Sequence, residues 1–196
     1  MAFPTSSLTN NQVHKEGNRA FVYDSTLGVW DQVRETDSTA YTIASGKVGS
    51  GVTFPAGHVL QIVWAQTSTI LSATTEGFKN LGLECQIVPT STTNKILVQW
   101  IVQAHLYTNH SGFKVKLLGG AVGSESAIYE SASTYAVYWN AASNFRGYNT
   151  WQELHTPATT AQVNYKIQVS IHSGNGRVDF QDANNRSYMQ LTEIVA

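Results

Sequence analysis

Six histidines and one cysteine are the side chains best suited to bind a metal ion or to act as a nucleophile. His105 and His110 are five residues apart, and the other histidines stand alone at positions 14, 58, 155 and 172. No pair has the spacing usual for zinc ligands, so we expect no metal site. Cys85 alternates with large aliphatic residues, and no motif places a basic group beside it. This pattern predicts a thiol buried in a core.

Carboxylates give no clear catalytic pattern either. Glycan hydrolysis needs two carboxylates that converge in a cleft, but no motif links the candidates, Glu125, Glu130, Glu153, Asp179 and Glu193. The oxygen-rich stretch from Asp179 to Asn185 lacks the calcium-loop pattern and is interpreted as a solvated turn. Gly119–Gly123 has no following helix and no Lys-Ser/Thr pair, which predicts a turn and not a phosphate loop. We therefore expect a protein that is not an enzyme and that needs no cofactor.

Aromatic residues form the one unusual concentration of side chains. They crowd a segment that is otherwise rich in Ser, Asn and Gly, and include Tyr135, Tyr138, Trp139, Tyr148 and Trp151. Aromatic rings stack on sugar faces and also anchor protein interfaces. These five residues are candidates for a glycan surface or a subunit interface. The pattern leaves open whether the rings fill a core or subunit contact or face an external ligand.

The composition excludes several classes of partner. The chain has 196 residues, of which 13% are charged, and a formal net charge of -1. Nucleic-acid binding relies on Lys and Arg, and here the basic residues are few and scattered. No apolar stretch approaches the ~20 residues of a membrane span, and the beginning lacks a basic and apolar signal peptide. We expect a soluble protein made without Sec export, with no nucleic-acid partner and no membrane insertion.

The clearest structural pattern is a long strand at residues 95–106. Residues of one parity are all apolar: Ile96, Val98, Trp100, Val102, Ala104 and Leu106. The other parity is mixed: Leu97, Gln99, Ile101, Gln103 and His105. Short alternating runs separated by turn sequences follow the same rule at 59–65, 81–88, 113–118, 135–139, 163–171 and 189–194. The pattern predicts an all-β domain, an antiparallel sandwich or jelly roll.

A smaller unit precedes this domain. Residues 20–33 are typical of two short strands joined near Gly28, and Ser45–Gly51 carries three glycines in seven residues. We therefore expect a hairpin attachment unit at 1–40, a flexible Gly/Ser linker at 41–56 and the jelly-roll domain at 57–196. A lone hairpin is marginally stable in water, so this unit must dock on a partner. Its candidate attachment residues are Phe21, Tyr23 and Trp30.

Five short segments at both ends and in the middle of the chain carry a family resemblance: Asn10–His14, Phe21–Val33, Gly57–Val63, Ile87–Val98 and Tyr188–Ile194. They resemble structural proteins of tailed phages, particularly cyanophages and other marine phages. The resemblance implies a trimeric jelly roll like that of the tumour-necrosis-factor superfamily, placed on a virion after synthesis in the host bacterial cytoplasm. Members of the family divide between tail fibres and head decorations.

The leading hypothesis is a non-enzymatic virion protein, a tail-fibre-like or surface appendage. Its N-terminal unit would attach to other virion proteins of the tail, adaptor or capsid, and its β domain would form a homotrimer exposed for host adsorption. One alternative is a capsid decoration, a cement or knob protein that stabilises the head. Another is a carbohydrate-binding module for host surface polysaccharide. The chain lacks the collagen-like or coiled-coil repeats of a long fibre, which favours a compact knob, decoration or adaptor.

Overall fold

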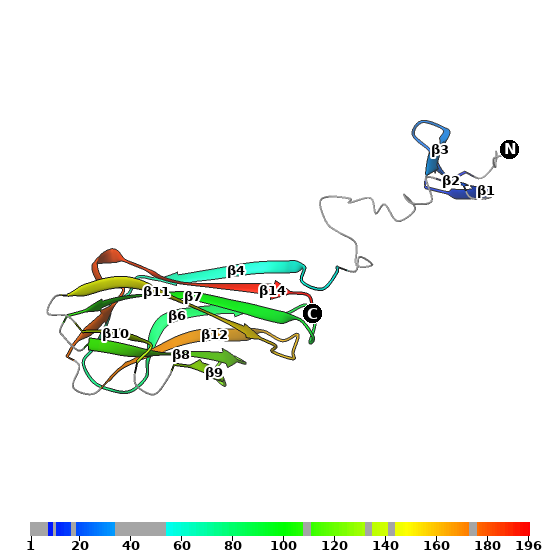
Figure 1. The fold of residues 1–196 in the computed structure, drawn as a ribbon. Coiled ribbons are helices and arrows are strands. Elements are labelled where there is room, and N and C mark those ends of the chain that lie inside the picture. Colours follow the sequence, from blue (N-terminus) through cyan, green and yellow to red (C-terminus); the bar gives the residue numbers. More distant parts are fainter. Residues whose placement is uncertain are drawn as a thin grey trace. The chain divides into compact units, whose positions relative to one another are not determined.

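The chain forms two compact units, Met1–Thr53 and Phe54–Ala196 (Figure 1). A computed structural model describes residues 8–9, 11–16, 19–33, 54–107, 111–131, 135–140, 144–172 and 176–196. The division between the units falls within the range predicted as a linker, 41–56. Residues 34–53 lie outside the described ones, so the flexibility of that linker stays a prediction.

The first unit contains a three-stranded antiparallel sheet in the order β1-β2-β3. Its strands are β1 (Val13–Glu16), β2 (Arg19–Asp24) and β3 (Val29–Val33). Between β2 and β3 the carboxylate of Asp24 accepts hydrogen bonds from two backbone N–H groups of the turn. Gly28 closes this turn at φ +67°, a conformation that favours glycine. The expected hairpin is present, and β1 is a third strand that the sequence pattern did not predict.

The second unit is built from strands that pair into two sheets. They are β4 (Val59–Thr67), β5 (Leu71–Ala73), β6 (Lys79–Ile87), β7 (Lys95–Leu106), β8 (Ser111–Gly120), β9 (Ser126–Glu130), β10 (Val137–Trp139), β11 (Phe145–His155), β12 (Val163–Ile171), β13 (Val178–Phe180) and β14 (Ser187–Ile194). A short 3-10 turn, η2 (Asp182–Asn184), separates β13 from β14.

The two sheets form a sandwich with jelly-roll connections. One sheet has the order β10-β8-β12-β6, with β9 also on β8, and the other has the order β4-β14-β7-β13-β5, with β11 on the free edge of β7. All pairs are antiparallel. The chain passes from β6 to β7 to β8, and from β11 to β12 to β13, by crossing between the sheets (Figure 1). The all-β jelly-roll architecture expected from the sequence is therefore confirmed.

The core lies between the sheets and is centred on β7. Its predicted inner face is buried throughout, with Trp100 only 1% exposed. The indole of Trp100 stacks on that of Trp151, with ring centroids 6.2 Å apart, and lies 5.9 Å from the ring of Tyr129. Cys85 is buried in the same core, as predicted, and burial raises the pKa of its thiol. These side chains join the two layers into one domain.

A buried carboxylate organises the end of the sandwich where the chain enters it. Glu193 is 0% exposed and accepts hydrogen bonds from Gln61 Nε2 at 2.6 Å, Asn94 Nδ2 at 2.7 Å and both Thr90 N and Oγ1, at 2.7 and 2.8 Å. Burial acts to raise the pKa of Glu193, but these hydrogen bonds outweigh it and lower the pKa. The carboxylate thus ties the β6–β7 turn to β4 and β14.

Backbone hydrogen bonds close the same end. Gly57 N donates to Val195 O, and Val195 N donates to His58 O, each at 2.9 Å. The chain is therefore fixed against the last strand before β4 begins.

Replacing Trp100 by alanine should lower the free energy of unfolding by about 3–5 kcal/mol, because it removes a buried indole and leaves a cavity. Denaturant unfolding of the purified protein measures this loss. Val122→Ala is the control, since Val122 is 58% exposed and its truncation should change stability by no more than about 0.5 kcal/mol. Equal stability of the two variants would contradict the placement of Trp100.

Candidate functional site

The outer face of the six-stranded sheet carries a broad surface without charged residues. In the middle of this face the registers of β4, β14, β7 and β11 align thirteen uncharged side chains, which we call the neutral face: Ile62, Trp64, Gln66, Leu97, Gln99, Ile101, Tyr148, Thr150, Gln152, Leu154, Tyr188, Gln190 and Thr192. Lys95 and Arg146 lie on the same side of the sheet at its two ends, and Arg186 donates to Gln66 at the edge. Several residues of the neutral face are large apolar residues left open to solvent, with exposed fractions of 66% for Trp64, 57% for Tyr148 and 56% for Ile62. Such a surface is unusual for a soluble domain that works alone.

A row of amides crosses the middle of the neutral face. The row begins beside Trp64 on β4 and continues through three glutamines on the next three strands: Gln190 on β14, Gln99 on β7 and Gln152 on β11. A shallow groove of about 450 Å³ is lined by Trp64, Gln190 and Gln99 of this row, and also by Tyr188 and Ile101. The surface therefore combines rings with groups that can both donate and accept hydrogen bonds.

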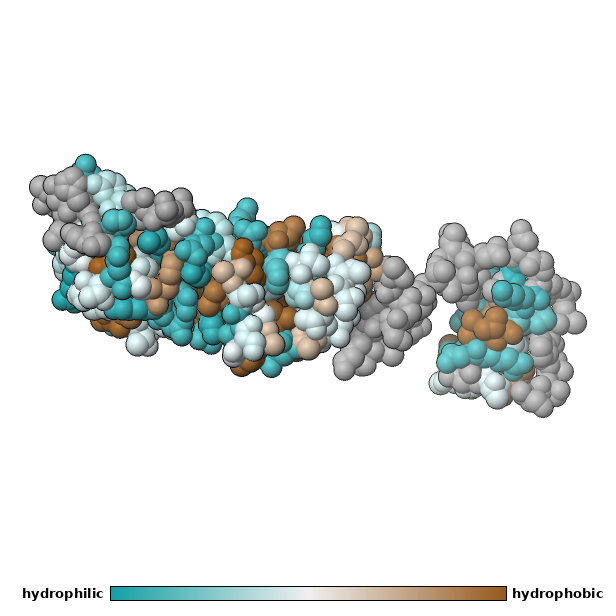
Figure 2. All heavy atoms as spheres, turned by 90° about the horizontal axis from the view of Figure 1, so that it is seen from below, coloured by the Kyte–Doolittle hydropathy of each residue, from teal (hydrophilic) through white to brown (hydrophobic). Residues whose placement is uncertain are grey.

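The opposite sheet has a different outer face. Lys114, Lys116 and Lys166 project from β8 and β12, and Glu84 projects from β6. Lys116 pairs with Glu130 at 2.8 Å, and Lys166 pairs with Glu125 at 2.7 Å. Figure 2 views this side of the domain, where hydrophilic residues surround separate hydrophobic ones. The two faces of the sandwich thus differ in charge.

The aromatic-rich segment does not form a single surface. Trp151 packs toward the core between Trp100 and Phe113, with a ring-centroid distance of 6.3 Å to Phe113. Trp139 stacks on Phe145 at 4.6 Å and also packs against the core. The positions of these two rings agree with a core role, which is one of the alternatives that the sequence left open.

The three tyrosines of that segment lie elsewhere. Tyr135 and Tyr138 contact each other at 4.6 Å between ring centroids, and Tyr135 lies 5.3 Å from His172. Tyr148 belongs to the neutral face, and its hydroxyl donates to Asn185 Oδ1 at 3.0 Å. A glycan or interface role for these tyrosines stays a prediction.

The candidate attachment residues of the first unit share one face of its sheet. Tyr23 and Trp30 are paired across β2 and β3, with ring centroids 5.3 Å apart, and His14 lies 5.9 Å from Trp30. Phe21 is on the same face but only 6% exposed, whereas Tyr23 and Trp30 are half-buried. An attachment surface on this face would therefore be formed by Tyr23 and Trp30 more than by Phe21.

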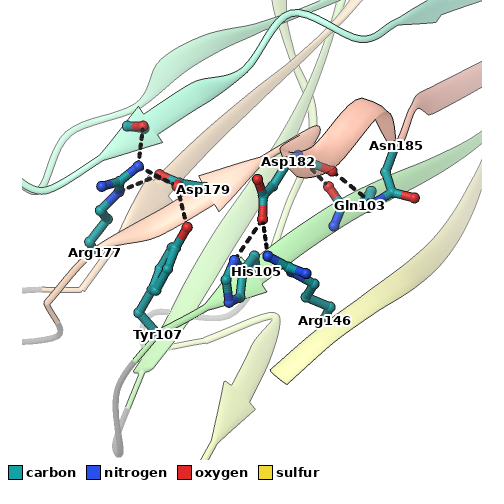
Figure 3. A network of polar contacts seen from close by, with 9 residues as sticks. Gln103, His105, Tyr107, Arg146, Arg177, Asp179, Asp182 and Asn185 are labelled. Carbon is teal, nitrogen blue, oxygen red and sulfur yellow. Dashed lines mark hydrogen bonds and ion pairs between the residues drawn. The ribbon is translucent and has the colours of Figure 1, made fainter. Parts of the chain in front are cut away.

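A network of ion pairs lies where the last residues of β7 meet β13 and η2 (Figure 3). His105 Nδ1 and Arg146 Nη2 lie 2.7 and 2.8 Å from Asp182 Oδ2. Arg177 forms a bidentate pair with Asp179, at 2.7 Å from Nε and 2.5 Å from Nη2. The sequence of residues 179–185 predicted a solvated turn, but in the structure Asp179 and Asp182 form ion pairs with Arg177 and Arg146.

A tyrosine, Tyr107, and a side-chain amide, that of Gln103, complete the network. Tyr107 donates its hydroxyl proton to Asp179 Oδ2 at 2.8 Å, and its ring lies 5.1 Å below the guanidinium of Arg177. Asp182 N donates to Gln103 Oε1 at 2.9 Å. Burial acts to raise the pKa of Asp179, but hydrogen bonds from Arg177, Ser72 and Tyr107 outweigh it and lower the pKa.

Two further features concern metals and membranes. Among the described residues, no three His, Cys, Asp or Glu side chains lie close enough together to hold a metal ion. In the same part of the chain there is no helix long and apolar enough to span a membrane.

The fold defines the chain as an antiparallel jelly-roll protein. No protein-family profile matches it, and neither does any curated protein. Among solved structures it is similar to infectious bursal disease virus Gx strain, at 12% identity over 76% of this chain and 42% of that chain, with a TM-score of 0.35. A mutant VP2 protein of that virus in derived T=1 particles has 10% identity, coverage of 76% and 40%, and a TM-score of 0.37.

A third similar structure is dimeric latent PorU from Porphyromonas gingivalis, with 7% identity, coverage of 97% of this chain and 20% of that chain, and a TM-score of 0.29. The chain spans less than half of the length of each of these three proteins.

Asp179→Asn should lower the free energy of unfolding by about 1–3 kcal/mol at neutral pH, because a buried acceptor of Arg177 and Tyr107 is lost. The pKa of Asp179 is lowered from its ordinary 3.8, so its stabilisation is present above that pH and is lost as pH falls through the lower folded value. The difference between wild type and variant should therefore shrink as the pH falls below 3.8. Urea unfolding at several pH values measures it, with the exposed Glu84→Gln as control; a pH-independent difference would contradict the ion pair.

Proposed function

We propose that this chain is a non-enzymatic structural protein of a phage virion, a tail-fibre-like or surface appendage. Its β domain associates into a homotrimer through the neutral face, and its N-terminal unit attaches the trimer to other virion proteins. The virion setting and the number of subunits follow the resemblance of the sequence to tailed-phage structural proteins. The single observation that carries the association is the absence of charge from the neutral face.

The composition of the neutral face supports association over exposure to water. The centres of protein interfaces are depleted in charged residues and enriched in Trp and Tyr. Trp64, Tyr148 and Tyr188 supply such rings here, and the ion pairs of the domain gather on the opposite sheet and at one end. Burial of this face in an assembly removes large apolar side chains from water, and the one guanidinium bonded to it, that of Arg186 on Gln66, lies at its edge.

Symmetry gives a reason for the amides. In a closed homotrimer, residues near the three-fold axis meet their own copies, so a charge placed there is brought close to identical charges. Gln99, Gln152 and Gln190 each offer a donor and an acceptor and can pair with identical groups from another subunit. The neutral face is therefore compatible with copies of itself.

The first unit has the properties of a docking element. Its three short strands are too few to bury a substantial core, and a sheet of this size is stabilised by packing on a partner. Apolar side chains remain open to solvent on it, with exposed fractions of 69% for Leu27 and 58% for Val13. Attachment to a larger particle would cover them together with Tyr23 and Trp30.

Both a tail appendage and a head decoration use an assembly of this kind. Cryo-microscopy of the particle, with the protein located in the map, distinguishes the two positions.

Introducing one charge into the neutral face should dissociate the trimer. Gln99 lies in the middle of the neutral face, so Gln99→Lys buries an unpaired charge in the contact, which costs several kcal/mol and should weaken association about a hundredfold or more. Light scattering at micromolar concentration measures the mass. Gln168→Lys, on the outer face of β12, is the matched control and should leave the trimer intact. A monodisperse wild-type monomer, or equal dissociation of both variants, would contradict the proposal.

Deleting residues 1–45 should separate attachment from association. The truncated protein keeps the whole β domain, so it should still form trimers, but it should no longer be incorporated into particles. Light scattering and the protein content of purified virions give the two readouts. If the truncated protein still assembles into virions, attachment lies in the β domain. If trimers are lost, the first unit contributes to association.

A further inference from the structure

We propose that Arg146 and Arg177 form a binding site for the anionic group of an acidic saccharide, either a carboxylate or a sulfate or phosphate ester. The two arginines flank His105 and Tyr107 at one end of the six-stranded sheet (Figure 3). The register supports this arrangement, because His105 pairs with Arg146 on one side of β7 and with Asp179 on the other. The site is separate from the neutral face and from the aromatic-rich segment.

Both guanidinium groups are held in place and yet open to solvent. The side chains of Arg146 and Arg177 are each 53% exposed, whereas their carboxylate partners Asp182 and Asp179 are 15% and 2% exposed. A flexible arginine loses conformational freedom when it binds a ligand. Here the ion pairs have already removed much of that freedom, so the remaining cost of ordering is small.

The network has more hydrogen-bond donors than it uses. Arg177 employs Nε and Nη2 on Asp179 and Ser72, and Arg146 reaches Asp182 through Nη2. Within the described part of the chain, Nη1 of both arginines has no partner. Gln103 is 1% exposed, and its Nε2 is buried without a partner among the described residues.

The acceptors, by contrast, are largely occupied. Both oxygens of Asp179 accept from Arg177, and one also accepts from Tyr107. Asp182 Oδ2 is shared by His105 and Arg146. A ligand that complements this site must therefore bring acceptors, and an oxyanion presents several in the geometry that guanidinium prefers.

The surroundings favour a saccharide as the carrier of that oxyanion. The ring of Tyr107 is covered by Arg177 and by His105, whose ring centroid lies 3.7 Å away, so polar groups and not stacking select the carrier. Hydroxyl groups beside the oxyanion of a saccharide can donate to Asp182 Oδ1, for which the described residues supply no donor. Because Asp179 and Asp182 balance the two arginines, recognition depends on directed N–H groups and not on a strong positive field. This makes the site unsuited to nucleic acid, which is bound through net positive charge.

The place of the site in the domain also suits a ligand outside the particle. Lys95, at the first end of β7, pairs with Ile194 close to the entry of the chain at Phe54, whereas Tyr107 follows the last residue of the same strand. The arginines are thus at the end away from the connection to the first unit. The use of the site in host adsorption rests on the proposed virion function, but the binding itself does not.

The experiment measures binding of the full chain to three oligosaccharides by titration calorimetry at low salt. The probes are a sulfated heparin-derived hexasaccharide, a carboxylated oligogalacturonate and neutral maltohexaose. We expect one or both acidic probes to bind and maltohexaose not to bind. The two acidic arms distinguish a sulfate from a carboxylate. Absence of binding to both, or equal binding of maltohexaose, would overturn the inference.

Two variants locate the site. Arg146→Gln removes a guanidinium whose described partner, Asp182, keeps His105, so the fold should persist and acidic-probe binding should weaken about tenfold or more. Arg177→Lys keeps the charge beside Asp179 but loses the bidentate geometry, and a comparable loss is expected. Arg19→Gln is the control, because Arg19 is an exposed arginine of β2 in the first unit and belongs neither to the neutral face nor to this network.

Unchanged affinity in both Arg146→Gln and Arg177→Lys, or an equal loss in Arg19→Gln, would show that the arginine pair does not form the site. Melting temperatures of all variants are measured on the same samples. Light scattering on these samples reports the trimer separately, so failure of the saccharide site and failure of the proposed association are distinguished.

Discussion

Burial of the inner face of β7 is the interaction on which the β domain depends. Trp100 packs between the layers against Trp151 and Tyr129, and the strand pairs with β11 along one edge and with β14 and β13 along the other. One strand therefore supports the core, the frame of the neutral face and the frame of the ion-pair network. A change that displaces β7 alters all three, whereas changes on the outer strands act locally.

The outer face of the same strand changes character along its length. Leu97, Gln99 and Ile101 belong to the neutral face, whereas Gln103 and His105 are buried beneath the ion pairs of β13 and η2. The boundary coincides with the break between β13 and β14. Where β14 runs beside Leu97, Gln99 and Ile101 of β7, the surface is uncharged, and where η2 interrupts it, carboxylates and arginines gather. One sheet of the sandwich thus carries two separate surfaces: the neutral face, which suits association with other subunits, and the ion-pair network, which suits the anionic group of a ligand.

Sequence periodicity was sufficient for β7, because an unbroken apolar parity has only one strand register that buries it. It was insufficient for β11, whose inward positions include Gly147, Asn149 and Glu153 and therefore show no apolar alternation. The ion-pair network could not be predicted, since His105 and Asp182 are 77 residues apart and meet only through strand pairing. The candidate rings illustrate the same limit: the composition located them, but only the register separates inward Trp151 from outward Tyr148.

The way in which the chain enters the β domain has a mechanical consequence. β4 pairs with β14 along almost its whole length, and the first contacts are those between Gly57, His58 and Val195. Antiparallel ladder bonds lie perpendicular to the strands, so tension applied at Phe54 along β4 loads the ladder in shear and not one bond after another. The Glu193 cluster, which holds Gln61, lies at the loaded end. A tether at this point can transmit force to the domain without peeling its first strand away.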